Sequence, residues 1–229
     1  MAKLLDDFLK FQAQTTPHPI GVEVDRAEGI FVYDTTGKRY FDLTSGLAVA
    51  NVGHRHPRVL KTITAQLEKY LHVMPYGEYA QEPQVMLAKK LASLLPKNLN
   101  TSYFVNSGTE ANEAAIKLAK RFTHRTELVS FINSYHGNTI GSLSATGNEN
   151  KKYVFRPLVP GVRFLDFNAI EQLDQITERT AGVIIEPIQG DAGVRVPSKE
   201  FIRQLRARCT EVGALLILDE IQTGIGRTG

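Results

Sequence analysis

The stretch SKEFIRQLRARCTEVGALLILD, residues 198–219, joins a helical pattern to a strand pattern through one glycine. Its first part predicts a helix that Gly213 ends, because glycine readily adopts the backbone conformation found after a helix. The run ALLIL that follows is apolar at every position, which is typical of a strand buried on both faces of a sheet. A helix that leads directly into such a strand favours a parallel sheet covered by helices.

The same alternation of helix and strand patterns, with short loops, fills the second half of the chain. Predicted strands cover 102–107, 127–132, 162–166, 182–186 and 214–219. Predicted helices cover 57–71, 81–96, 108–123, 137–145, 168–176 and 198–213. We therefore predict an α/β fold with a mostly parallel sheet and helices on both of its faces.

Residues 1–52 carry a different pattern. A short helix is predicted at 1–12, and apolar and polar residues alternate around the turn at 35–38. This alternation predicts short antiparallel strands, at 21–26, 30–33 and 39–43. We predict two parts, an N-terminal segment at 1–52 and a larger α/β domain at 53–229.

Composition narrows the classes of function. The 229 residues are 42% apolar and 22% charged with a formal net charge of +3, which argues against nucleic-acid binding. No apolar run approaches the roughly 20 residues of a membrane span, and the N-terminus lacks the apolar core of a secretory signal. The single cysteine, Cys209, fits a reducing compartment, so we expect a cytoplasmic protein. The histidines of HRH at 54–56 lack companion ligands, so no metal site is expected.

Polar side chains follow four of the predicted strands at the points where those strands end. They occur at 106–109, 133–138, 186–191 and 219–222. In open α/β sheets, ligands bind beyond the carboxyl ends of the strands. The four segments are therefore expected to share one polar crevice.

Gly108 and Thr109 open a predicted helix, whose free N–H groups form an anion site with phosphate as the usual anion. The same residues also fit a plain helix cap, in which Ser107 or Thr109 caps the helix and Glu113 completes a capping box. The spacing of these residues is compatible with both interpretations.

Asp219 ends a fully apolar strand, and a buried carboxylate requires a cationic or N–H partner. A cap on the following turn or an ion pair with Arg227 would each supply one. Tyr135 and His136 lie beside a glycine at another strand end. They fit either stacking on a flat ring or ordinary packing at the edge of the sheet.

Five segments, taken in order, resemble the class III (ω-amino acid) aminotransferases, which are fold type I enzymes that use pyridoxal 5′-phosphate (PLP). The matching segments are GIFVYDTTGKRYFDLTSGLAVANVGHRHPRV (29–59), FVNSGTEANEAAIKLAKR (104–121), SYHGNTIGSLSATG (134–147), IIEPIQGDAG (184–193) and LLILDEIQTGIGRTG (215–229). Within this family, the segments resemble those of acetylornithine, succinylornithine and 4-aminobutyrate transaminases. The resemblance implies a fold type I PLP-dependent transferase with a small antiparallel N-terminal segment that belongs to the family's small domain.

The resemblance also implies which residues of the crevice bind the cofactor. The residues that would hold its phosphate are Ser107, Gly108 and Thr109. Tyr135 would stack on the pyridine ring with His136 beside it, and Gln222 would bond the phenolic oxygen of the ring.

Two carboxylates are the expected catalytic residues. Asp219 would pair with the ring nitrogen of PLP and keep it protonated, so that the cofactor acts as an electron sink. Glu186 would lie near the edge of the ring. These roles come from the resemblance, since an acid at a strand end has structural explanations as well.

Three positions depart from the family's pattern, and all three are expected at the substrate. Asn138 replaces an arginine that binds a substrate carboxylate in several members, and an amide cannot form the bidentate ion pair that arginine forms. Asp191 replaces a glutamate that pairs with a C-terminal arginine. Leu47 stands where ornithine-specific relatives carry tyrosine, which argues against ornithine as the donor.

The Schiff-base lysine of the family is expected beyond residue 229, so the large domain would be incomplete at its C-terminus. We expect the intact protein to be a homodimer that transfers an ω-amino group from an acetylornithine-like donor to a 2-oxo acid, 2-oxoglutarate. The 229-residue chain alone would be inactive. The alternatives are an aminomutase or decarboxylase of the same fold, and a non-catalytic binding remnant. A dinucleotide-binding protein is disfavoured, because no G-x-G-x-x-G follows the first parallel strand.

Overall fold

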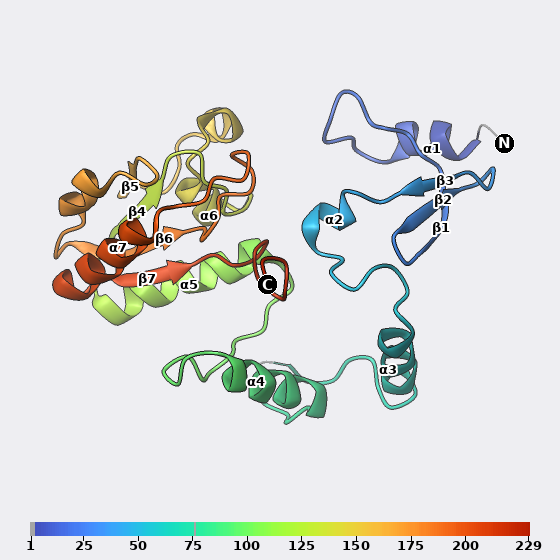
Figure 1. Ribbon diagram of the computed structural model, residues 1–229, viewed down its shortest axis with the longest axis horizontal. Helices are drawn as coiled ribbons and strands as arrows, with labels where there is room; N and C mark the ends of the chain where they lie inside the picture. The colour runs from blue at the N-terminus through green and yellow to red at the C-terminus, as the bar shows by residue number, and fades with distance from the viewer. Residues whose placement is uncertain (1–2, 76) are drawn as a thin grey trace. The chain divides into compact units, whose positions relative to one another are not determined.

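The computed structural model describes residues 3–75 and 77–229, which divide into two compact units, Met1–Val85 and Met86–Gly229 (Figure 1). The predicted helix at 1–12 begins with two residues that lie outside the described ones, and its described part is α1, Lys3–Phe11. None of the described helices is long and apolar enough to cross a membrane. The boundary expected between residues 52 and 53 stays a prediction.

The first unit contains an antiparallel sheet in the order β1-β2-β3, which confirms the small antiparallel segment. Its strands are β1 (Val24–Glu28), β2 (Phe31–Asp34) and β3 (Arg39–Phe41). Asp34 fixes the turn between β2 and β3, because its Oδ1 accepts hydrogen bonds from the N–H groups of Thr36 and Lys38, each at 2.9 Å. The Thr36 hydroxyl also donates a hydrogen bond to Oδ1. These hydrogen bonds, above all the one from the hydroxyl, lower the pKa of Asp34 to about 2.

A left-handed turn follows the sheet at α2, Ser45–Ala48. All four of its residues have positive φ, between 49° and 67°. An L-residue in this conformation costs roughly 1–2 kcal/mol, so the turn requires support. Asp42 supplies part of it, since its Oδ1 accepts a hydrogen bond from Ser45 N at 2.9 Å and its Oδ2 lies 2.7 Å from His54 Nε2. Two right-handed helices follow along the chain, α3 (Pro57–Leu67) and α4 (Glu82–Leu94).

The second unit contains a parallel sheet in the order β5-β4-β6-β7, as the continuous apolar runs predict (Figure 1). Its strands are β4 (Glu127–Phe131), β5 (Val162–Leu165), β6 (Thr180–Ile185) and β7 (Leu215–Leu218). Its helices are α5 (Gly108–Thr123), α6 (Ile140–Ala145) and α7 (Lys199–Val212), with 3₁₀ turns at η1 (Glu149–Lys151), η2 (Tyr153–Phe155) and η3 (Ile170–Gln175). β6, at the centre, is buried at every residue.

Helices cover both faces of this sheet. Val129 of β4 packs in a hydrophobic cluster with Phe201 of α7. The preceding residue, Leu128, packs in a second cluster with Ile116 of α5. Successive strand residues point to opposite faces, so the two clusters lie on opposite sides of the sheet. The predicted α/β architecture is confirmed.

The helix that precedes β7 begins and ends as the sequence predicts. Ser198 caps α7, because its Oγ accepts a hydrogen bond from Phe201 N at 3.1 Å. Gly213 ends the helix in the left-handed conformation with φ 70°, and β7 begins two residues later. The glycine therefore turns the chain directly into the sheet.

Two predictions of secondary structure were wrong. Residues 102–107 form no strand, because a strand requires a hydrogen-bonded neighbour and this segment pairs with none in the described part of the chain. The helix predicted at 168–176 is the 3₁₀ turn η3, Ile170–Gln175. The other predicted strands of the second unit differ from the observed bounds by only one or two residues.

Gly147 provides a test of how tightly the loop after β4 packs. A Cβ on this residue would lie 1.9 Å from the carbonyl oxygen of Phe131, which is backbone and cannot move aside. We predict that Gly147→Ala lowers the free energy of unfolding by about 3 kcal/mol. The control, Gly193→Ala, has open space but a φ of 89°, so it should lose only about 1 kcal/mol. Urea denaturation of both variants measures the difference, and equal losses would contradict this packing.

Candidate active site

Asp219 lies directly after β7 and is almost completely buried, with 5% of its side chain exposed. Its backbone N–H donates to Ile185 O at 2.8 Å, which extends the pairing of β7 with β6 by one residue. The apolar strand therefore fixes the carboxylate at the carboxyl edge of the sheet. This edge is where the sequence predicts a ligand site.

Three hydrogen-bond donors surround the Asp219 carboxylate. Its Oδ2 lies 2.7 Å from His136 Nδ1 and accepts a hydrogen bond from Asn112 Nδ2 at 2.8 Å. Its Oδ1 accepts a hydrogen bond from Ile221 N at 3.1 Å, which is the turn cap considered as a structural alternative. Because the donors come from α5, from the loop after β4 and from the turn after β7, the acid joins three segments that are distant in sequence.

Asn112 is a site residue that the sequence patterns missed. It is buried on α5, and its Nδ2 also donates to the carbonyl oxygen of His136 at 2.7 Å. It shares the buried stripe of that helix with Ile116 and Ala119. A polar residue on an otherwise apolar helical stripe was the signal that could have identified it.

His136 is buried and held on several sides. Its backbone N–H donates to Thr146 Oγ1 at 3.0 Å, and its Nδ1 faces Asp219. Its other ring nitrogen, Nε2, is buried without a hydrogen-bond partner in the described residues. An unpaired buried polar atom is uncommon in folded proteins, and a ligand at the site is one explanation for it.

Glu186 lies at the end of β6 and is 7% exposed. Its Oε2 accepts a hydrogen bond from Tyr135 N at 3.0 Å, and its Oε1 accepts one from Gly190 N at 3.2 Å. Burial nevertheless raises the pKa of Glu186 above its ordinary value. Two buried carboxylates thus lie at the ends of neighbouring strands, as expected.

The start of α5 is a capped helix terminus. Ser107 is the cap, and its Oγ accepts a hydrogen bond from Glu110 N at 3.3 Å, while Glu110 Oε2 accepts one from Asn106 N at 2.7 Å. The interpretation in which Glu113 completes a capping box is wrong, because Glu113 Oε1 instead accepts a hydrogen bond from Ser142 N at 3.0 Å. Glu113 therefore fastens the first turn of α6 to α5.

Three glycines let the polar loops approach one another closely. A Cβ on Gly137 would lie 2.4 Å from Thr109 Oγ1, and one on Gly108 would lie 2.8 Å from the side chain of Ile221. A Cβ on Gly190 would lie 1.7 Å from Gln222 Oε1. Contacts thus link the four predicted segments, 106–109, 133–138, 186–191 and 219–222, one to another.

Asn138, Asp191 and Leu47, the residues expected at the substrate, differ in their contacts and exposure. Asn138 is exposed, and Asp191 pairs with Lys151, whose Nζ lies 2.7 Å from Asp191 Oδ2. The same ammonium lies 4.4 Å from the ring centroid of Tyr135. Leu47 belongs to the first unit, on the left-handed turn α2, where it is 78% exposed. Lys151 is a further residue that the sequence patterns did not single out.

A family model described as aminotransferase class-III matches residues 11–229. The chain belongs to the class III aminotransferases. This family depends on PLP, and the resemblance drawn from the five sequence segments is confirmed.

Two curated aminotransferases share more than two fifths of the aligned residues with this chain. An acetylornithine aminotransferase of Methanopyrus kandleri is 47% identical over 205 residues, which cover 88% of this chain and 52% of the relative. A [LysW]-aminoadipate semialdehyde/glutamate semialdehyde transaminase of Sulfurisphaera tokodaii is 42% identical over 91% of this chain and 54% of its own length. The chain thus spans about half the length of the curated relatives that it matches.

Solved aminotransferase structures share the fold. The adenosylmethionine-8-amino-7-oxononanoate aminotransferase of Methanocaldococcus jannaschii superposes with a TM-score of 0.92 at 28% identity, over 98% of this chain and 56% of that one. The taurine:2-oxoglutarate aminotransferase of Bifidobacterium kashiwanohense, solved with PLP and glutamate, has a TM-score of 0.86 at 29% identity, over 97% and 56%. These likenesses support the fold type I assignment of this aminotransferase chain.

The raised pKa of Glu186 predicts a pH dependence of stability. Because the folded state binds this proton more tightly than the unfolded state, the stabilisation is present below the ordinary pKa of 4.5 and is lost as the pH rises through the folded-state pKa. We expect the free energy of unfolding of the wild type, relative to Glu186→Gln, to fall as the pH rises from 4.5.

Urea denaturation at a series of pH values measures this difference. Glu171→Gln, an exposed glutamate on η3, is the matched control and should show no such trend. A difference between wild type and Glu186→Gln that stays constant or grows with pH would contradict a raised pKa.

Proposed function

We propose that the protein is a PLP-dependent aminotransferase that takes the ω-amino group of an acetylornithine-like donor and transfers it to 2-oxoglutarate. The observation that carries this proposal is the carboxylate of Asp219, buried at the end of β7 and held by His136 and Asn112. A buried carboxylate stabilises a neighbouring cation strongly, because little water screens the interaction. The pyridine nitrogen of PLP, when protonated, is such a cation.

The residues around Asp219 fit the chemistry of PLP. The cofactor has a cationic ring nitrogen, a flat ring and an anionic phosphate. Asp219 suits the nitrogen, and the half-buried ring of Tyr135 suits the flat face. The free N–H groups at the start of α5, next to Ser107 and Gly108, suit the phosphate. The glycines at the loop contacts leave no room for a Cβ, which keeps these groups close together.

Each protein group would have a distinct task. Bound PLP supplies an electron sink for the carbon that carries the transferred amino group. Asp219 holds a proton at the ring nitrogen, and His136 and Asn112 fix the orientation of its carboxylate by donating to Oδ2. Gln222 packs against Gly190 and is proposed to bond the phenolic oxygen. Glu186 holds the Tyr135 backbone in place through its Oε2.

The names of the relatives support the choice of substrates. Acetylornithine and [LysW]-aminoadipate semialdehyde both appear in those names, which supports an acetylornithine-like donor. The name taurine:2-oxoglutarate aminotransferase supports 2-oxoglutarate as the acceptor. We propose Leu47, Asn138 and Asp191 as residues that contact the substrate.

The proposal includes a cytoplasmic homodimer. The first unit exposes large apolar side chains, with Ile20 at 90% and Leu43 at 91% exposed. Burying such side chains stabilises an interface by about 25 cal/mol for each Å² removed from water. A second subunit would supply that burial.

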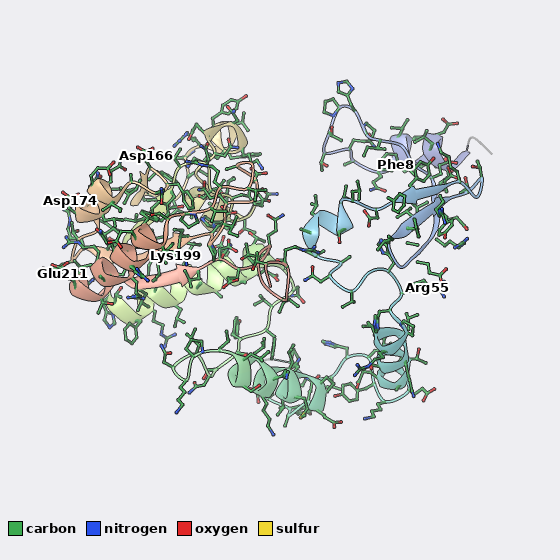
Figure 2. All side chains as sticks on the ribbon, in the orientation of Figure 1. Phe8, Arg55, Asp166, Asp174, Lys199 and Glu211 are labelled. Atoms are coloured by element: carbon green, nitrogen blue, oxygen red, sulfur yellow. The ribbon has the colours of Figure 1, made fainter. Side chains whose placement is uncertain are left out.

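Replacing Asp219 tests the proposed cofactor site directly. Asp219→Asn keeps the shape but removes the charge and replaces one of the two acceptor oxygens with an NH2 donor, so we predict that it weakens PLP binding about 10- to 100-fold, or about 1.5–3 kcal/mol. Equilibrium dialysis with PLP measures the affinity. Asp174→Asn, an exposed aspartate on η3, is the matched control and should bind PLP like the wild type (Figure 2).

Two outcomes would count against the proposal. If Asp219→Asn binds PLP as tightly as the wild type, the carboxylate does not pair with the ring nitrogen. If the wild type does not bind PLP, the chain has the fold without the cofactor. Thermal unfolding of each variant shows whether a loss of binding follows from a loss of structure.

A further inference from the structure

Lys151 places an ammonium group beside the proposed PLP site. Its Nζ lies 2.8 Å from Asp191 Oδ1 and 2.7 Å from Oδ2, so it contacts both oxygens of the carboxylate. It also lies 4.4 Å from the ring centroid of Tyr135, within the range of a cation–π contact. The two charged side chains are 35% and 36% exposed, so a dissolved ligand can reach them.

The position of Lys151 is fixed by the chain around it. Lys151 ends η1, which begins after Asn148, and Asn148 caps the turn by accepting a hydrogen bond from Asn150 N at 3.1 Å. The next residue, Lys152, is buried and donates from Nζ to Thr146 O at 2.7 Å. Burial lowers the pKa of Lys152, whose ammonium also lies 3.8 Å from the ring centroid of Phe164. Lys152 anchors the segment, which leaves Lys151 to face the site.

A chain of contacts joins Lys151 to the buried carboxylate of Glu186. Its partner Asp191 follows Gly190, whose N–H donates to Glu186 Oε1 at 3.2 Å. Glu186 in turn accepts the hydrogen bond from the backbone of Tyr135, the residue that Lys151 contacts through its ring. The ammonium is therefore next to the site without being part of the Asp219 network.

We propose that Lys151 determines substrate specificity by binding a carboxylate of the substrate that is remote from the reacting carbon, and that Asp191 holds it until that carboxylate arrives. This inference rests on the proposed PLP-dependent function. Asn138 carries no charge, so it cannot neutralise a carboxylate, whereas Lys151 can.

The partial exposure of the ion pair makes such an exchange feasible. An ion pair in contact with water stabilises a protein only weakly, so replacing Asp191 by a substrate carboxylate requires little free energy. A second explanation is that the pair only tethers η1 to the loop at Asp191. The two explanations differ in one respect, because a tether does not distinguish a charged ligand from an uncharged one of the same shape.

Binding of glutarate and of the uncharged glutaramide tests the proposal, measured by calorimetry on the chain saturated with PLP. We expect the wild type to bind glutarate more tightly than glutaramide. Lys151→Met should weaken glutarate binding at least 10-fold and leave glutaramide binding unchanged, and Lys151→Arg should restore most of the affinity for glutarate. Asp191→Asn should tighten glutarate binding several-fold, because it removes the competing carboxylate.

Lys199→Met is the matched control, since it removes the same charge from an exposed residue at the start of α7 (Figure 2). Unchanged glutarate binding in Lys151→Met, or no glutarate binding by the PLP-loaded wild type, would overturn the proposal. The PLP affinity of each variant is measured separately by equilibrium dialysis. If PLP binds but glutarate binding does not depend on Lys151, only this inference fails. A wild type that does not bind PLP contradicts the proposed function as well.

Discussion

The buried carboxylate of Asp219 is the constraint on which the site depends. Removing a charge from water is costly unless donors surround it, and the strand before Asp219 leaves it 5% exposed. His136, Asn112 and the backbone of Ile221 supply the donors, and each belongs to a different segment. Satisfying one acid therefore fixes the start of α5, the loop after β4 and the turn after β7 relative to one another, which assembles the site.

The architecture could be predicted because burial of the strands leaves a direct trace in the sequence. β6 is buried at every residue, and its sequence is correspondingly apolar or small throughout. Capping is equally local, so Ser198 and Gly213 predict the ends of α7 closely. The segment 102–107 has a strand-like composition but no pairing partner in the described residues, and pairing is not a local property. Composition alone could not exclude that strand.

The two carboxylates of the candidate site could be predicted, because each directly follows an apolar strand. Asp219 and Glu186 stand out because carboxylates rarely follow fully apolar runs, and the structure places them at neighbouring strand ends. Asn112 was missed because its partners lie on other elements. Lys151 was missed for the same reason, since its pairing with Asp191 spans 40 positions and follows no periodicity. Their contacts became visible only when the fold brought the partners together.

The most direct measurement is the protonation state of the pyridine nitrogen in bound PLP. With PLP labelled with ¹⁵N in the ring, nitrogen NMR distinguishes a protonated from a neutral ring. We predict that the bound nitrogen stays protonated at a pH at which that of free PLP in the same buffer is neutral, because the Asp219 carboxylate stabilises the cation. A bound ring nitrogen that titrates like that of free PLP would contradict it.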